Sequence, residues 1–358
     1  MVLHFLKYLV LYTRKQPPEP LKRPLHTSIA PMELDLTNSN LETFPHLSGF
    51  EYKKVNASSN SIQVLWDEHM PRGIEELNLD ENRLSTDGLL IEWPDTIKTL
   101  SLAYNPYRIL DIVVVWPTAL RVLNISNTNL IEFPTNLPPS LEVLNVSRTY
   151  IKQISHLPEG LKELYVNSAE LKFLPKRLPP ALEILNASNN SLRNGGLSLL
   201  WGSSLKFLDL NYNHLTHPPR RLPNTIEHLN LSGNFIDSIS AEANFPESLK
   251  VLHLGHNKIF ELPAWLGKRR QLRFTIQRNL LVKPVEAVNC LTWISQWIGP
   301  GYTEAAHMIQ KGWRRYRMRR RLSAWRKSAI LRNELLALAM HPDRAGRYEN
   351  ISSEWYKV

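Results

Sequence analysis

One column of hydrogen-bonding side chains recurs along most of the chain at nearly constant spacing. It belongs to a repeated LxLxxNxL pattern, with steps of 20 to 23 residues, and contains in order Ser39, Asn60, Asn82, Asn105, Thr128, Thr149, Ala169, Asn190, Asn213, Asn234, Asn257 and Asn279. An asparagine amide both donates and accepts, so it can satisfy backbone groups that a turn leaves buried and unpaired. Threonine replaces part of this bonding and alanine none. We therefore expect the unit around Ala169 to be the loosest.

The residue types that usually perform catalysis form no recognisable motif. Of the twelve histidines and the single cysteine, Cys290, none lies in HExxH or in a Cys/His metal spacing, and the sequence holds no GxSxG, P-loop or dinucleotide fingerprint. We expect a protein that is not an enzyme and that uses no metal, cofactor or small-molecule substrate. A lone cysteine cannot form an internal disulfide, which predicts an intracellular, cytoplasmic protein.

The elements that position this column are short strands. Each LxxLxL segment predicts a strand with inward leucines, and stacked units form a parallel β-sheet over a continuous apolar core. The rest of each unit is short and rich in proline, as at 133–139 and 174–180. Because proline favours extended geometry, we expect an extended or 3₁₀ convex side. The predicted solenoid covers residues 32–284 in about twelve units.

This pattern resembles the leucine-rich repeat family over about residues 32 to 284, and the LPxxLP spacers are most similar to the short repeats of bacterial effectors. The resemblance implies an α/β-type curved solenoid that binds proteins on its concave face. Some such effectors carry a cysteine-dependent ubiquitin ligase domain. Only about 75 residues follow the repeats here, and Cys290 has no basic partner nearby in sequence, so a ubiquitin ligase is the least favoured function.

Residues between the inward leucines are expected on the concave face. The column between the two leucines of LxL, which includes Asn56, Asn78 and Asn124, is polar and mainly asparagine, and we interpret it as a structural hydrogen-bonded ladder. The variable column before it carries apolar and aromatic groups that are candidates for partner contact. The predicted partner-binding residues are Val122, Val143, Glu163, Tyr165, Ile184, Phe207 and His228.

Two further features of the repeats have a structural explanation. A charged column nearly alternates in sign, which favours correct stacking of neighbouring units: Lys53, Glu75, Lys98, Arg121, Glu142, Lys162, Glu183, Lys206, Glu227 and Lys250. Asn-x-Ser triplets at Asn56, Asn124, Asn145, Asn186 and Asn230 fall at one repeat position. The repeat itself therefore generates them, and we expect them to carry no sugar.

A basic segment follows the repeats. Residues 285–299 have helical apolar spacing and predict a C-terminal capping helix that includes Cys290. Residues 300–332 hold ten Lys or Arg against one acid, whereas residues 32–299 have a net charge of −2. We expect a basic helix over 300–332, and a short helix with a polar tail over 333–358.

The basic segment resembles the IQ motif of calmodulin-binding proteins, although Arg315 stands where the motif has glycine. Matching or anchor-spaced residues are Ile309, Gln310, Trp313, Arg314, Tyr316, Arg319 and Leu322. The resemblance implies binding of calmodulin or a related EF-hand protein. Nucleic acid and anionic membrane remain alternative partners for the same basic helix.

The ends of the chain suggest two further expectations. Residues 1–31 precede the first repeat, which begins at Met32. We interpret them as an extension that is either disordered or rarely or never translated, and the alternative is a membrane or targeting segment. Residues Met340 to Arg344 resemble a C-terminal signature of leucine-rich repeat and IQ proteins from large DNA viruses. That resemblance implies a viral protein acting in the host cytoplasm.

Overall fold

The computed structural model describes residues 33–108, 114–240, 245–263, 265–266, 269 and 271–281. The chain divides into two compact units. Unit 1 comprises the described residues up to Asp209 together with Arg221–Ile226, and unit 2 comprises Leu210–Arg220 with those from Glu227 onward. The predicted N-terminal extension (1–31), capping helix (285–299), basic helix (300–332) and tail (333–358) lie outside the described residues.

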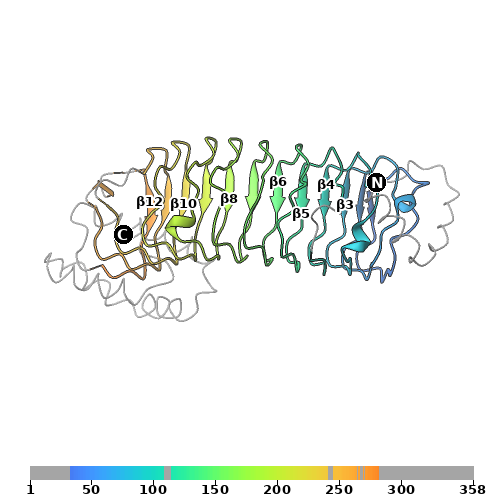
Figure 1. Ribbon diagram of the computed structural model, residues 1–358, viewed down its shortest axis with the longest axis horizontal. Coiled ribbons are helices and arrows are strands. Elements are labelled where there is room, and N and C mark those ends of the chain that lie inside the picture. The colour runs from blue at the N-terminus through green and yellow to red at the C-terminus, as the bar shows by residue number, and fades with distance from the viewer. Residues whose placement is uncertain are drawn as a thin grey trace, which may run out of the picture. The chain divides into compact units, whose positions relative to one another are not determined.

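Every expected repeat in the described part of the chain contributes one three-residue strand (Figure 1). Unit 1 contains β1 (Glu33–Asp35), β2 (Lys54–Asn56), β3 (Glu76–Asn78), β4 (Thr99–Ser101), β5 (Val122–Asn124), β6 (Val143–Asn145), β7 (Glu163–Tyr165), β8 (Ile184–Asn186) and β9 (Phe207–Asp209). Unit 2 contains β10 (His228–Asn230), β11 (Val251–His253) and β12 (Arg273–Thr275). Within each unit the strands pair in sequence order and in parallel.

The middle residue of each strand points into the core. Leu77, Leu100, Leu123 and Leu144 are each at most 1% exposed, and the register pairs Leu100 with Leu123 and Leu123 with Leu144. Side chains alternate along a strand, so the residues on either side of each buried leucine lie on the outer face of the sheet. The predicted parallel sheet with an inward leucine column is confirmed.

The segments of unit 1 that connect the strands on the side opposite the sheet are short, as the proline-rich spacers predicted. Three connections contain a 3₁₀ turn: η1 (Asp67–His69), η2 (Asp87–Leu89) and η3 (Asn194–Gly196). The other described connections of this unit are turns, bends and extended segments.

The asparagine column bridges neighbouring repeats. Asn82 Oδ1 accepts the N–H of Ile62 at 3.0 Å, and its Nδ2 donates to the carbonyl oxygens of Ala57 and Leu79, both at 3.0 Å. The partners therefore lie in two consecutive units, so one side chain joins them. Cross-repeat bonds of the same kind are made by Asn60, Asn105, Asn190, Asn234, Asn257 and Asn279, and Asn213 donates to Leu210.

The bridge is interrupted where asparagine is replaced. The hydroxyls of Thr128 and Thr149 donate to Ile125 and Val146 of their own repeats, at 3.1 and 2.9 Å. In the regular units, the backbone N–H two residues after each column position donates to the next asparagine. At Ile151, which is 1% exposed, this N–H has no acceptor among the described residues, because the next column residue is Ala169. The interruption leaves a buried donor unpaired.

Restoring the missing amide provides a direct test of this interruption. We predict that Ala169→Asn stabilises unit 1 by about 1 kcal/mol, because the new amide can accept from Ile151 and donate to the carbonyls of the two adjoining repeats. Ala169→Ser is the control, since a hydroxyl offers only part of this bonding. Amide hydrogen exchange should show the Ala169 unit less protected than the Asn190 unit in the natural chain. Equal protection, or no gain from Ala169→Asn, would contradict the prediction.

The sequence did not predict a backbone feature that recurs beside the asparagine column. The residue just before each column position adopts a left-handed conformation, with φ between 47° and 58° at non-glycine positions such as Glu81, Arg148 and Tyr212 and 66° at Gly233. Asn127 and Asn189 suit this conformation, whereas Arg and Tyr do not favour it. Tyr, Arg, Ser and Glu all occur there, so residue type provided no signal.

One buried histidine should make unit 1 sensitive to acid. His69 is fully buried, its Nδ1 lies 2.7 Å from the Phe44 carbonyl oxygen, and its Nε2 has no partner among the described residues. Burial lowers the pKa of His69 from its usual 6.5. Near pH 6.5 the unfolded chain therefore binds a proton at His69 more readily than the folded chain does. The free energy of unfolding consequently falls as the pH drops below that value.

We predict that the free energy of unfolding of the natural chain falls as the pH is lowered from 7.5 to 5.5, more steeply below pH 6.5, with about 1.4 kcal/mol per pH unit as the limiting slope for one proton. His69→Phe removes the titrating group and should flatten the slope over the same interval. Equal slopes in the two proteins would show that other groups cause the acid sensitivity.

Candidate functional site

The outer face of the unit 1 sheet consists of two rows of side chains. The first row contains the first residue of each strand, and the second row contains the third. The register aligns Val122 with Val143, Val143 with Glu163, Glu163 with Ile184 and Ile184 with Phe207. Five predicted partner-binding residues therefore form one continuous row across β5 to β9.

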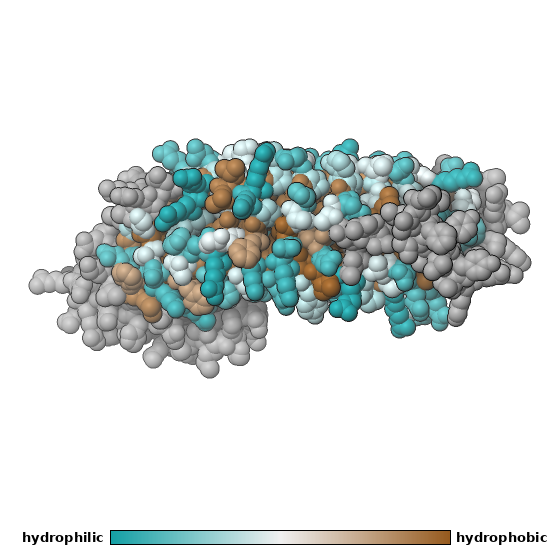
Figure 2. All heavy atoms as spheres, viewed as in Figure 1, coloured by the Kyte–Doolittle hydropathy of each residue, from teal (hydrophilic) through white to brown (hydrophobic). Residues whose placement is uncertain are grey.

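This row exposes apolar surface that the core does not use. Phe207 is 36% exposed, and Val122, Val143 and Ile184 are half-buried. Figure 2 shows hydrophobic residues lying among hydrophilic ones on the face turned to the viewer. We call Val122, Val143, Glu163, Ile184 and Phe207 the apolar row. His228, also predicted as a contact, is the first residue of β10 in unit 2.

Glu163 interrupts the apolar row and is held by Tyr165. The Tyr165 hydroxyl donates to Glu163 Oε2 at 2.8 Å. Partial burial and this hydrogen bond raise the pKa of Tyr165 to about 12, so the hydroxyl keeps its proton at neutral pH. The Tyr165 hydroxyl therefore orients the Glu163 side chain, which lies in the row between Val143 and Ile184.

The asparagines of the second row are capped locally. The hydroxyls of Ser126, Ser147 and Ser188 donate to Oδ1 of the asparagine two residues earlier, at 2.7, 2.6 and 2.7 Å. This explains the Asn-x-Ser triplets physically. The predicted ladder along the stack occurs at Asn124, whose Nδ2 donates to the Ser101 hydroxyl at 2.9 Å.

The local caps leave donors on the sheet face. In the part of the chain that the structure describes, Nδ2 of Asn145 and Nδ2 of Asn186 have no acceptor, and both residues are half-buried. These amides lie two residues along the strand from Val143 and Ile184. The face thus offers apolar side chains with amide donors beside them.

The alternating charged column forms the predicted ion pairs. Lys98 Nζ lies 2.6 Å from Glu75, Lys162 Nζ lies 2.7 Å from Glu142, and Lys206 Nζ lies 2.6 Å from Glu183. Hydrogen bonding from Lys98, Lys162 and Lys206 holds the pKa of these three carboxyls below its usual value. These charges are therefore engaged with each other, which supports a structural role.

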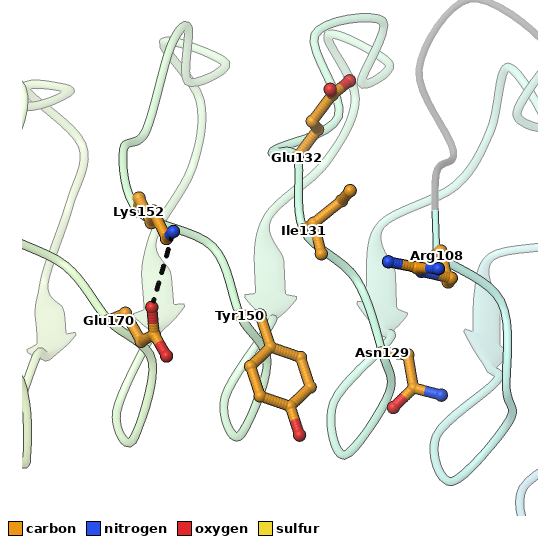
Figure 3. Close-up of a pocket in the computed structure, with 7 residues that line it drawn as sticks. All are labelled: Arg108, Asn129, Ile131, Glu132, Tyr150, Lys152 and Glu170. Carbon is orange, nitrogen blue, oxygen red and sulfur yellow. Dashed lines mark ion pairs between the residues drawn. The ribbon is translucent and has the colours of Figure 1, made fainter.

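A hollow of about 660 Å³ lies on the loops that follow the asparagine column in unit 1 (Figure 3). Its lining comprises Arg108, Asn129, Ile131, Glu132, Tyr150, Lys152 and Glu170. Lys152 Nζ is 3.9 Å from a Glu170 oxygen, and Tyr150 is 52% exposed. The hollow coincides with the interruption at Thr128, Thr149 and Ala169, because Asn129, Tyr150 and Glu170 directly follow these residues.

Neither a metal site nor a membrane span is found in what the structure describes. No group of three or more His, Cys, Asp or Glu side chains there is arranged to hold a metal ion. Among the same residues, no helix has the length and apolarity needed to cross a bilayer. Cys290 and the predicted calmodulin-binding residues Ile309 to Leu322 lie outside the described ranges.

Comparisons with known proteins agree with this geometry. A family model described as Leucine Rich Repeat matches residues 204–224, and no curated protein sequence matches the chain. The APL1 leucine-rich repeat domain has a TM-score of 0.54 at 21% identity, over 69% of this chain and 68% of that one.

Two bacterial structures are also similar. A leucine-rich repeat protein of Leptospira interrogans has a TM-score of 0.51 at 22% identity, over 70% of this chain and 74% of that one. The leucine-rich effector YopM of Yersinia pestis has a TM-score of 0.49 at 26% identity, over 72% and 87%. The matched repeat, the parallel strands and the likeness to the APL1 and Leptospira structures show that the described part of this chain has the leucine-rich repeat fold.

Proposed function

We propose that the chain is a non-enzymatic interaction scaffold whose unit 1 sheet face binds a protein partner. The observation that supports this most is the apolar row, in which Val122, Val143, Ile184 and Phe207 expose hydrophobic surface in register. Partly exposed aliphatic and aromatic groups surrounded by polar side chains are typical of protein contacts. The leucine-rich repeat fold itself is typically a protein-binding scaffold.

The contacts define the chemistry of the partner. Apolar side chains of the partner would cover Val143, Ile184 and Phe207, and backbone carbonyls would accept from the amides of Asn145 and Asn186. A lysine or arginine would pair with Glu163. His228, which the sequence also predicted as a contact, occupies the same repeat position in unit 2.

Charge introduced into the apolar row tests this proposal. Tagged full-length protein and the variant with Ile184→Asp and Phe207→Asp would be compared by quantitative affinity purification, and captured candidates would then be titrated as purified proteins. We expect the double variant to lose its partner by more than tenfold, because two carboxylates would be desolvated at the interface. Phe173→Asp is the matched control, since Phe173 is 60% exposed and lies outside the sheet. Equal loss in the control would overturn the assignment to this face.

We also propose that residues 300–332 recruit calmodulin or a related EF-hand protein inside the cell, in the host cytoplasm if the chain is viral. Support comes from the sequence: Ile309, Trp313, Tyr316 and Leu322 have the spacing of apolar anchors, within a segment of net charge +9. The competing proposal, favoured by the same charge, is attachment of the solenoid to nucleic acid or anionic membrane.

Titration of the full chain with calmodulin, with and without calcium, separates these two possibilities. Binding that resists salt and that Ile309→Glu abolishes would support the EF-hand partner. Binding to duplex DNA or anionic vesicles that falls steeply with salt, without a calmodulin complex, would support the alternative. The comparison of the full chain with a 1–299 truncation in the affinity experiment distinguishes partners of the segment from partners of the repeats.

A further inference from the structure

A second exposed surface lies in unit 2, on the loops that follow its strands. It is formed by the residues directly before or after the asparagine column, and we call Tyr212, His214, Phe235, Lys258 and Arg278 the aromatic-basic edge. All five side chains are exposed. Tyr212 is 56% exposed and Phe235 is 43% exposed.

The rings and cations of this edge contact one another across repeats. The His214 and Phe235 rings stack with centroids 5.6 Å apart and planes 26° apart. Lys258 Nζ lies 4.8 Å from the centroid of the Phe235 ring. Tyr212 lies against Gly233, where an added Cβ would come within 2.7 Å of the ring. The glycine therefore leaves room for the ring to lie flat along the next loop.

Backbone bonds hold the edge in place. The Tyr212 N–H donates to Ser232 at 2.9 Å, Gly233 donates to Gly255 at 2.9 Å, and His256 donates to Gln277 at 2.8 Å. Asn234 and Asn257 bridge the same loops from below through their amides. The edge is consequently a preorganised row, with neighbouring positions separated by about 5 Å, the spacing of paired strands.

The charge of the edge is positive and uncompensated. Among the residues that the structure describes, no carboxylate lies within ion-pair distance of Lys258 or Arg278. Burial and the neighbouring Arg278 lower the pKa of His256, so this histidine binds a proton less readily than usual. Asp237, two residues after Phe235, and Glu261, three residues after Lys258, form no ion pair with either cation in the described part of the chain.

Partly exposed aromatic rings interleaved with cations suit a ligand that carries both flat bases and negative charge. Bases stack on aromatic rings, and phosphates pair with lysine and arginine, which is how single-stranded nucleic acids are bound without sequence preference. We propose that the aromatic-basic edge binds single-stranded nucleic acid. One base would stack on the outward face of Tyr212, a second would displace Lys258 from the face of Phe235 that His214 does not cover, and phosphates would pair with the released Lys258 and with Arg278. This site is formed by residues of the repeats and includes none of the basic segment 300–332.

Fluorescence anisotropy with a labelled oligouridylate and the full-length protein provides the first test. We expect Tyr212→Ala with Phe235→Ala to weaken binding by roughly tenfold or more, because stacking is lost at two bases. Lys258→Glu should weaken binding and reduce its salt dependence. Phe173→Ala, a control at an exposed phenylalanine of unit 1, should bind like the natural chain. Circular dichroism of each variant checks that the repeats remain folded.

Photocrosslinking identifies where the ligand sits, because the basic segment 300–332 can also attract phosphates. An oligonucleotide containing 4-thiouridine would be irradiated with the full chain, and the crosslinked peptides sequenced by mass spectrometry. Crosslinks at Tyr212, His214 or Phe235 that disappear in the double alanine variant are the expected result. Crosslinks confined to residues 300–332, with unchanged affinity in the double variant, would overturn the proposal, and so would absence of binding.

Discussion

Asn190→Ala is expected to lower the free energy of unfolding of unit 1 by roughly 3 kcal/mol, because the variant leaves buried backbone groups in two repeats without partners. Asn190 Oδ1 accepts the N–H of Leu171 at 3.1 Å, and its Nδ2 donates to Val166 at 2.9 Å and to Ala187 at 3.1 Å. The side chain is 7% exposed, so water cannot readily replace it. The loss is large because one amide serves several groups at once.

The control for this variant is the adjacent residue. Ser191→Ala removes a hydroxyl for which the structure shows no hydrogen bond, while the backbone bond from Ser191 to Leu171 at 2.9 Å remains. Chemical denaturation combined with hydrogen exchange is the suitable measurement, since a repeat protein can open locally. A similar destabilisation by both variants would show that the amide bridge is not the cause. The natural Ala169 one repeat earlier shows that the array keeps its strands with one amide bridge missing.

The repeating part of the fold was predictable from sequence because its period is also its structural unit. The inward leucines, the outward pairs and the bridging asparagines each follow from one position in LxxLxL and the asparagine after it. The alternating ion pairs at Glu75, Glu142 and Glu183 followed from the same count. Predictions that depend on residues 1–31 and 285–358 stay predictions, because those residues lie outside the described ranges.

Features without a residue signature could not be predicted. The left-handed residue before each column position is more often a residue such as Glu81, Arg148 or Tyr212 than an asparagine or glycine. The conformation occurs even before Thr149 and Ala169, so the turn of the repeat requires it and not the asparagine bridge. The serine caps on Asn124, Asn145 and Asn186 were visible only as triplets that imitate glycosylation sites. The aromatic-basic edge was missed because its members lie at two repeat positions, on either side of the column.

In the candidate site, too, some features were predictable from the sequence and others were not. The register placed Val122, Val143, Glu163, Ile184 and Phe207 in one row, as the column predicted, since a parallel sheet of equal repeats aligns equal positions. The hydrogen bond that joins Tyr165 to Glu163 depends on side-chain direction, which the period does not specify. Sequence therefore identified which residues share the face, and the structure identified which groups on it are engaged and which are available.

Gly196→Ala is expected to destabilise unit 1 by about 3 kcal/mol, because the added methyl has no space. Gly196 ends the 3₁₀ turn η3, and a Cβ on it would lie 2.2 Å from the backbone carbonyl oxygen of Lys172 in the preceding repeat. The same approach occurs in η2, where a Cβ on Gly88 would lie 2.3 Å from the Gln63 carbonyl oxygen. A backbone atom cannot move aside as a side chain can, so either repeat must shift. Gly196 also accepts the N–H of Leu174 at 2.7 Å, and that shift would strain this bond.

The adjacent glycine makes the test specific. An added Cβ on Gly195 meets nothing within 4 Å, so Gly195→Ala should leave stability unchanged or raise it slightly by restricting the unfolded chain. Urea denaturation of both variants, with hydrogen exchange at Leu174 as a local readout, separates overlap with the preceding repeat from the general effect of replacing glycine. Equal stability of the Gly196→Ala and Gly195→Ala proteins would mean that the repeats tolerate a wider spacing at η3 than their hydrogen bonds indicate. Loss confined to Gly196→Ala would establish that close contact between the backbones of consecutive repeats requires glycine there.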